Sequence, residues 1–318
     1  MKQSLIKFFN AYWLKEYILL WKYYKLSFAP AKKPLLVSVI DHRRNCQGLT
    51  DRFKGIVSVY ALAKAMNLEY KCIFTHPLLL SEFLVPNQYN WLPEADELSD
   101  SLMDVRFRIM RKEPRVKRLM NIFPSRKQVL VYANIDYLEQ INQSFNQQFT
   151  WGTLFNELFI PNERLQKLLD YHLNVIKSGE YIACVFRFQT LLGDFQEYHY
   201  KSLSNSKERE QLLKKNVDEL LKLAQAEQCT VLVTSDSSTF IQAVSKYDSI
   251  YTLPGKVVHM DCVTDEKDEV YLKSFVDFFM LSKARKVYSM GTKQMYPTAF
   301  PFYAAKVNDV PFERILID

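Results

Sequence analysis

Charged and hydroxyl-bearing side chains follow three apolar runs of this 318-residue chain. Arg187 comes directly after the run 181–186, a Ser-Asp-Ser triplet at 235–237 ends the next, and Thr298 lies in a polar loop after a third. Short apolar runs with polar flanks predict buried strands. Because ligands of open α/β sheets bind just beyond the carboxyl ends of strands, these side chains are candidates for a binding site.

Arg187 and Asp236 each allow two interpretations. The guanidinium of Arg187 is a rigid, permanently charged fork of donors that suits a phosphate. It could equally pair with a carboxylate and close the sheet edge. Asp236 could accept hydrogen bonds from a ribose or a base, or it could cap the helix that is expected to begin at Thr239.

The first half of the chain opens with a similar pattern. An apolar run at 35–40 leads into a polar loop with Gly48, and an apolar helix is expected over 56–66. This is the opening of a Rossmann-type unit, although the GxGxxG dinucleotide fingerprint is absent. A helix beginning near Thr50 would present free amides and a positive dipole to an anion, and Arg52 would add positive charge. Alternatively, the basic side chains of this turn only face solvent and bind no ligand.

Strands and helices are expected to alternate along the whole chain. Further strands are predicted at 70–74, 128–133, 230–234, 249–253 and 286–290, and helices at 137–160, 207–226, from 239 onward and at 274–284, with a loop at 291–303. Residues 162–177 begin the second half. Such alternation predicts an α/β fold with parallel sheets. The length exceeds that of one hydrophobic core. We therefore expect two facing, doubly wound Rossmann-like domains, 31–161 and 162–318, after an N-terminal helical segment, 1–30.

The composition argues against several kinds of function. The five cysteines are scattered without a CxxC pair and the five histidines show no paired spacing, so neither a disulfide framework nor a metal site is expected. The net charge, 42 − 35 = +7, is mild for the length. The basic stretch 106–118 is interrupted by Pro114 and is expected to be a solvated face, with an anionic acceptor or lipid headgroups nearby as the alternative. No nucleic-acid motif accompanies it, so no nucleic-acid partner is expected.

Residues 4–28 are rich in leucine, isoleucine and aromatic side chains, and are interrupted by charges at Lys7, Lys15, Glu16, Lys22 and Lys25. The segment is too charged to span a bilayer, and no secretion signal is recognisable. Two interpretations fit it. A basic, aromatic amphipathic helix can lie in the membrane interface, or the helix can pack its apolar stripe on the body of the protein.

The order of these motifs resembles the superfamily of GDP-fucose-dependent fucosyltransferases, which includes the α1,2-, α1,6- and protein O-fucosyltransferases and the nodulation fucosyltransferase. The resemblance rests on Gly48-Leu49-Thr50-Asp51-Arg52, Arg187, Ser235-Asp236-Ser237 and the stretch from Thr298 to Ala304, and it covers roughly residues 35–305. It implies two Rossmann-like domains of the GT-B type, a GDP-fucose donor, inversion at the anomeric carbon and no metal. The stretches 51–56 and 84–91 are similar to those of uncharacterised members from gut Bacteroidetes.

The resemblance also implies roles for individual residues. Arg187 takes the place of the arginine that binds the GDP pyrophosphate, and Thr298 that of a hydroxyl on the phosphates. The implied donor-binding residues are Gly48, Arg52, Arg187, Ser235, Asp236, Ser237, Thr298 and Phe300. The chain departs from the family pattern at Val185, where the family has a histidine, and at Gln47, where a second glycine is typical. Thr298 replaces a serine and keeps the hydroxyl.

The chain is therefore expected to be an inverting, metal-independent glycosyltransferase that needs no cofactor. Its donor would be GDP-fucose and its acceptor a glycan or lipid-linked sugar of a surface polysaccharide. Arg187 would be catalytic through the leaving group, and Asp194, Asp51 and Asp41 are the candidate bases. We expect it in the cytoplasm, at the inner face of the membrane. The alternatives are another nucleotide-sugar donor, or a non-catalytic, membrane-docked nucleotide- or anion-binding protein.

Overall fold

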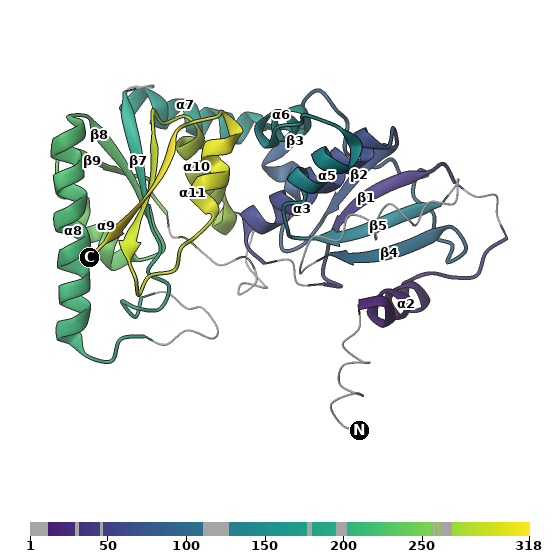
Figure 1. Ribbon diagram of the computed structural model, residues 1–318, viewed down its shortest axis with the longest axis horizontal. Coiled ribbons are helices and arrows are strands. Elements are labelled where there is room, and N and C mark those ends of the chain that lie inside the picture. The colour runs from purple at the N-terminus through teal and green to yellow at the C-terminus, as the bar shows by residue number, and fades with distance from the viewer. Residues whose placement is uncertain are drawn as a thin grey trace. The chain divides into compact units, whose positions relative to one another are not determined.

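The computed structural model describes residues 12–28, 32–44, 47–110, 127–176, 180–194, 202–255, 257, 260 and 269–318. Its contacts divide the chain into two compact units. The first contains Met1–Leu80 and Leu84–Ile160, and the second contains Ser81–Phe83 and Pro161–Asp318. Each unit has its own parallel sheet (Figure 1). The predicted α/β fold with parallel sheets is thereby confirmed.

The sheet of the N-terminal unit has four parallel strands in the order β2-β1-β5-β4. They are β1 (Leu35–Ile40), β2 (Glu69–Phe74), β4 (Val105–Met110) and β5 (Gln128–Ala133). Every residue of β1 and β5 is buried, as in parallel strands covered on both faces. The helices of this unit that follow β1 and β5 are α3 (Leu49–Ala65), α5 (Leu138–Phe145) and α6 (Trp151–Leu158). A short sheet pairs β3 (Leu84–Pro86), which follows the 3-10 turn η1 (Leu80–Glu82), with β6 (Phe159–Pro161).

Close packing of α3 on β5 depends on a glycine. A Cβ atom on Gly55 would lie 2.0 Å from the carbonyl oxygen of Ala133. Only a residue without a side chain allows the helix to approach the end of the strand this closely. The α3 helix is consequently buried along most of its length.

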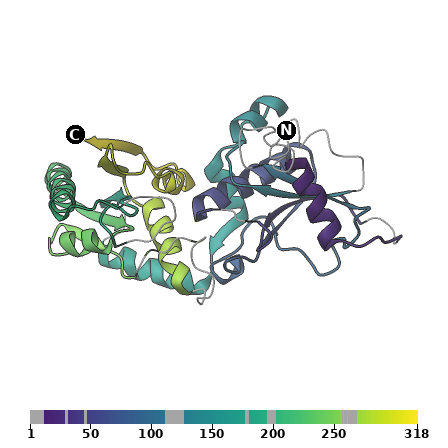
Figure 2. The same ribbon diagram turned by 90° about the horizontal axis from the view of Figure 1, so that it is seen from below.

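The basic stretch 106–118 is not simply a solvated face. Its first part belongs to β4, an edge strand on which Phe107 and Ile109 are buried and Arg106 and Arg108 are half-buried. The rest, 111–118, lies outside the described residues. Strand β4 was not predicted because its alternating arginines resemble a polar segment, whereas alternation is the pattern of a strand with one polar face. Helix α2 (Tyr12–Tyr23) packs against β4 (Figure 2, purple).

The sheet of the C-terminal unit has five parallel strands in the order β11-β10-β7-β8-β9. They are β7 (Tyr181–Phe186), β8 (Thr230–Ser235), β9 (Ile250–Thr252), β10 (Val287–Thr292) and β11 (Phe312–Ile317). Numbered from β7, this is the order 3-2-1-4-5 of doubly wound, nucleotide-binding folds. Chain order reverses between β7 and β10, and this is the position where such folds bind their ligands.

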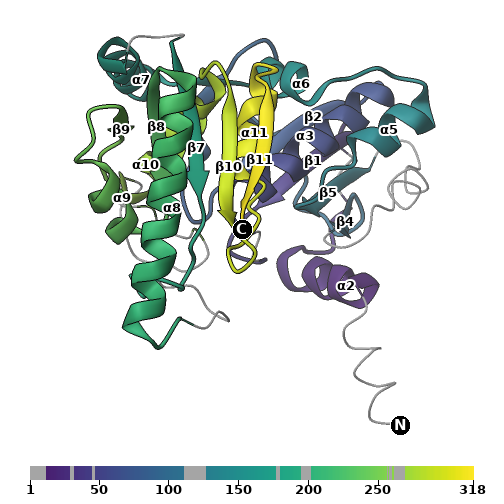
Figure 3. The same ribbon diagram turned by 60° about the vertical axis from the view of Figure 1, so that its left-hand side comes forward.

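Helices cover both faces of this sheet. They are α7 (Glu163–Ile176), α8 (Ser206–Glu227), α9 (Ser238–Val244), α10 (Glu269–Ser282) and α11 (Phe300–Val307). In Figure 3, α8 crosses in front of the strands and α10 lies behind them. Alternate residues of β7, namely Ile182, Cys184 and Phe186, join the core cluster shared with α8 and α9. The predicted loop at 291–303 is wrong at its end, because α11 begins at Phe300. Strand β11 was not predicted.

Candidate functional site

Arg187 lies at the carboxyl end of β7, beside the position where the strand order of the C-terminal sheet reverses. Its guanidinium Nη1 is 3.0 Å from the Oδ2 atom of Asp236, which follows β8. The Arg187 side chain is 17% exposed and that of Asp236 is 1% exposed. The arginine therefore reaches the surface of this edge, while its carboxylate partner lies beneath it.

Asp236 is held by more than the arginine. The backbone N–H groups of Phe188 and Gln189 donate to its two oxygens at 2.8 and 2.7 Å. Burial raises the pKa of the Asp236 carboxyl, while Arg187 and these two N–H groups oppose that effect. One carboxylate thus ties the loop after β7 to the end of β8 and orients Arg187. The interpretation of Asp236 as a helix cap finds no support in these bonds, since Ser237 caps α9 by accepting from the N–H of Phe240 at 3.1 Å.

Asp194 lies at the N-terminus of α9, where its Oδ2 atom accepts three hydrogen bonds. The donors are the hydroxyls of Ser237 at 2.8 Å and Ser238 at 3.2 Å, and the N–H of Thr239 at 2.7 Å. Burial alone would raise the pKa of Asp194, but the hydrogen bonds outweigh it and hold that pKa below its ordinary value. The positive end of this helix therefore already carries an anion. Of the other predicted residues, Ser235 accepts from the N–H of Ser237 at 3.1 Å.

Thr298 and Phe300 stand at the start of α11. The hydroxyl of Thr298 accepts from the N–H of Phe300 at 3.2 Å, and the ring of Phe300 packs edge-on against Phe278 at 5.6 Å. Thr298 is half-buried and directly precedes Ala299, the N-cap of α11. The structure thus gives both residues a local role that is compatible with a nearby ligand.

The remaining predicted residues belong to the N-terminal unit. Gly48 is the N-cap of α3 and has no side chain to occupy the helix amides, and a Cβ built on it would meet nothing within 4 Å. Asp51 forms an ion pair with Lys54 and its side chain is 30% exposed. Arg52 is buried, and its guanidinium donates to the carbonyl oxygens of Gln47 at 2.8 Å and His76 at 2.6 Å. Arg52 therefore braces the loop before α3.

Comparison with known proteins assigns the fold. No protein-family model and no curated protein sequence matches the chain. A mutant of Arabidopsis thaliana FUT1 in complex with GDP is 12% identical, with 95% of this chain and 74% of that chain covered, at a TM-score of 0.56. NodZ α-1,6-fucosyltransferase, co-crystallized with GDP, is 11% identical, with 87% of this chain and 92% of that chain covered, at a TM-score of 0.51. A NodZ structure from Bradyrhizobium also matches. POFUT1 in complex with GDP-fucose is 10% identical, with 91% of this chain and 99% of that chain covered, at a TM-score of 0.51.

The fold is that of the fucosyltransferases. The resemblance inferred from the motifs is thus confirmed at the level of the fold, which these likenesses establish at 10 to 12% identity. Among the residues that the structure describes, no group of three or more His, Cys, Asp or Glu side chains is placed to hold a metal ion.

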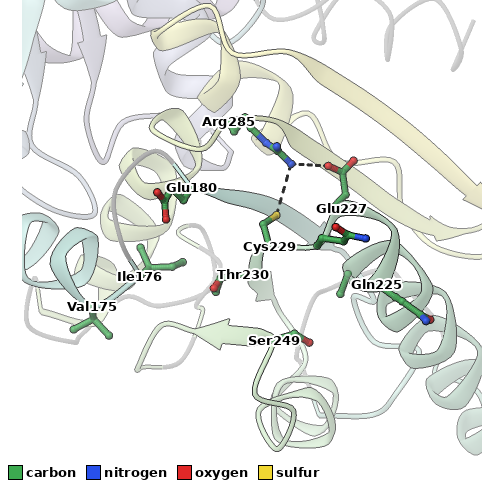
Figure 4. Close-up of a pocket in the computed structure, with 11 residues that line it drawn as sticks. Val175, Ile176, Glu180, Gln225, Glu227, Cys229, Thr230, Ser249 and Arg285 are labelled. Atoms are coloured by element: carbon green, nitrogen blue, oxygen red, sulfur yellow. Dashed lines mark hydrogen bonds and ion pairs between the residues drawn. The ribbon is translucent and has the colours of Figure 1, made fainter.

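Two cavities of the C-terminal unit lie at opposite edges of its fucosyltransferase-like sheet. One of about 730 Å³ opens at the amino edge, where Cys229 and Arg285 precede β8 and β10 (Figure 4). Two of its charged side chains pair with each other, because Arg285 donates to Glu227 at 2.7 Å. The other, of about 360 Å³, lies at the carboxyl edge beside the ends of β10 and β11. Since ligands of such sheets bind at the carboxyl edge, the amino-edge cavity is the weaker candidate for a ligand site.

Sequence reasoning missed two features of this site. Thr292 ends β10 and lines the smaller cavity, and its buried hydroxyl has no hydrogen-bond partner in the structure. Its place after the apolar run 286–290 could have marked it. Asp277 of α10 is buried and accepts from the hydroxyl of Thr234 at 2.8 Å while it pairs with Lys273. The i, i+4 spacing of Lys273 and Asp277 was the signal for that pair.

Proposed function

We propose that this chain is an inverting, metal-independent glycosyltransferase that transfers fucose from GDP-fucose to a hydroxyl of a glycan acceptor in surface polysaccharide synthesis. The observation that carries the proposal is Arg187, held by Asp236 beside the point where the strand order of a fucosyltransferase-like sheet reverses. The similar structures of FUT1 and NodZ hold GDP, and that of POFUT1 holds GDP-fucose.

Arg187 suits the chemistry of the leaving group. When the bond between fucose and GDP breaks, negative charge grows on the diphosphate, and a positioned guanidinium can stabilise it without further reorganisation. By comparison with other preorganised donors, loss of this group would slow transfer by about 10²- to 10³-fold. The N-terminus of α9 cannot help in the same way because Asp194 occupies it. The amides at Gly48 and the hydroxyl of Thr298 are the other groups proposed to contact the donor.

The acceptor hydroxyl needs a base, and the contacts and exposure of three carboxylates support a choice among them. Asp194 is occupied by three donors at α9. The Asp41 side chain is 4% exposed, pairs with Arg43 at 2.6 Å and accepts from the Tyr132 hydroxyl at 3.2 Å. Asp51 keeps 30% of its side chain exposed. A base must reach the hydroxyl that it deprotonates, so we assign this role to Asp51.

A non-catalytic, nucleotide-binding protein is the second candidate. The observation that favours it is Val185, a buried apolar residue at the position where the family pattern has a histidine. Hydrolysis of GDP-fucose by the purified chain, or transfer to an added sugar, would eliminate this candidate. A screen of GDP-mannose and other nucleotide sugars would test the choice of fucose.

Calorimetric titration of GDP in the presence of a chelator tests the nucleotide site. GMP and ADP are the ligand controls, and Arg187→Ala is the test variant. Arg285→Ala is a matched control, because Arg285 also pairs with a carboxylate at the surface of the C-terminal unit but lies at the amino edge of its sheet. We expect micromolar binding of GDP, much weaker binding of GMP and ADP, and at least a tenfold loss (about 1.4 kcal/mol) only in Arg187→Ala. Absence of GDP binding, or equal binding by both variants, would contradict the proposal.

A further inference from the structure

Helix α2 is attached to the N-terminal unit by one face only. Leu19 and Leu20 are buried, and Glu16 accepts from the N–H of Ile109 at 2.9 Å and pairs with Arg108 at 3.3 Å. Both partners belong to the edge strand β4, whose free backbone the helix thereby covers. These contacts fix the orientation of the helix on the N-terminal unit, so the same face of the helix always points away from the unit.

The other face is apolar and exposed. Its large side chains Tyr17, Ile18 and Trp21 have exposed fractions of 56%, 53% and 70%, and the segment that follows the helix adds Leu26 at 60% and Phe28 at 92%. We call these five residues the α2 outer patch. Single exposed apolar side chains are ordinary on soluble proteins, whereas a contiguous group of them indicates a binding surface.

The charges around the patch indicate what binds it. Lys22 and Lys25 are exposed and Lys15 is half-buried, whereas the single carboxylate within residues 12–28, that of Glu16, is buried against β4. Lys25 also reaches Asp100, at 2.7 Å. Aromatic side chains with lysines beside them are the composition that partitions into the headgroup region of an anionic bilayer. No helix among the described residues is long and apolar enough to cross a bilayer.

We propose that the α2 outer patch docks this protein on an anionic membrane surface, with Trp21, Ile18 and Phe28 in the interface and Lys15 and Lys22 at the phosphates. The two interpretations of the N-terminal segment then describe opposite faces of one helix. The proposal does not depend on the donor, and it would present the protein to lipid-linked acceptors if the proposed function holds.

Vesicle flotation of the full chain tests the docking. Vesicles of phosphatidylcholine with phosphatidylglycerol are compared with vesicles of phosphatidylcholine alone, at low and high salt. The test variant is Trp21→Ser with Ile18→Ser, and the control is Tyr171→Ser, which removes a 62% exposed aromatic residue from α7. A third variant, Lys22→Glu, reverses one exposed charge.

We expect the wild type and Tyr171→Ser to float with the anionic vesicles. The double variant should lose at least tenfold in partitioning, because two large apolar side chains no longer leave water. Lys22→Glu should lose about fivefold or more, an effect that salt reduces. Because the altered side chains are exposed, unchanged thermal unfolding is expected for every variant. Trp21 should also give a blue-shifted emission on anionic vesicles that Trp21→Phe lacks.

Several results would overturn the docking. One is failure of the wild type to bind anionic vesicles, and another is equal binding by the double variant. A third is dimerisation that the double variant abolishes while vesicle binding stays absent, which would assign the patch to a second copy of the chain. Loss of GDP binding leaves the docking intact, so failure of either proposal can be recognised separately.

Discussion

Asp194 is both a candidate base and the acceptor at the start of α9, and substitution separates these roles. In Asp194→Ala the N–H of Thr239 loses a charged acceptor at 2.7 Å, and the hydroxyls of Ser237 and Ser238 lose theirs at 2.8 and 3.2 Å. The hydroxyls can rotate toward water, so most of the loss comes from one charged hydrogen bond and the helix dipole. We expect destabilisation by about 2–3 kcal/mol. Asp194→Asn keeps an oxygen acceptor and should lose only about 1 kcal/mol.

The pH dependence of this loss has a definite sign. The pKa of Asp194 in the folded protein lies below its ordinary value, so the carboxylate contributes stability above the unfolded pKa of about 3.9. That contribution disappears as the pH falls through the folded pKa. The difference in unfolding free energy between wild type and Asp194→Asn should therefore be constant near neutrality and shrink below about pH 4.

Urea unfolding at neutral and acidic pH, together with fucosyl-transfer rates, checks this prediction. The control is Asp248→Asn, an exposed aspartate of the same unit that should change stability by less than about 0.5 kcal/mol. The reasoning is refuted if Asp194→Asn unfolds like wild type at neutral pH yet loses transfer completely. That combination would make Asp194 the base and not a cap.

Two further predictions concern packing and thiol reactivity. Gly55→Ala should destabilise the protein by about 3 kcal/mol or more, because its Cβ would lie 2.0 Å from the carbonyl oxygen of Ala133. Gly48→Ala at the N-cap of the same helix should destabilise it by about 1 kcal/mol or less, because a Cβ there meets nothing within 4 Å. Thermal or urea unfolding measures both losses. Equal losses in the two variants would contradict the close approach. An alkylating reagent at mildly alkaline pH should modify Cys229 well before Cys72, because burial raises the pKa of Cys72 to about 12 while Cys229 is half-buried at a cavity. Peptide mapping measures the order, and earlier labelling of Cys72 would show that its strand opens.

Three of the correctly predicted strands share one physical property. Those beginning at Leu35, Gln128 and Tyr181 are buried on both faces, so their sequences are continuous apolar runs with no competing periodicity. The edge strands β4 and β11 were missed because one side of each meets solvent and carries charges such as Arg106 and Glu313. Their assignment depends on a neighbouring strand that lies far away in the sequence.

The sequence predicted where the residues of the candidate site lie along the strands, but not which residues they contact. Arg187 and Asp236 were both located at strand ends, and the structure shows that they pair at 3.0 Å. The sequence alone did not indicate that Arg52 turns inward to carbonyl oxygens, because its partners Gln47 and His76 belong to separate loops. The start of α8 shows a contact within one turn of the chain, because Asn205 is its N-cap and accepts from the N–H of Lys207 at 3.0 Å.

The anchoring of Arg187 has a consequence for the thermodynamics of ligand binding. A free arginine side chain loses rotamer entropy equivalent to about 2 kcal/mol when it is fixed on a ligand. Here Asp236 restrains that side chain during folding, and the N–H groups of Phe188 and Gln189 restrain Asp236 in turn. An anion that arrives at this edge therefore meets a donor with little conformational freedom left to lose. Its association should carry a small entropic penalty from the protein.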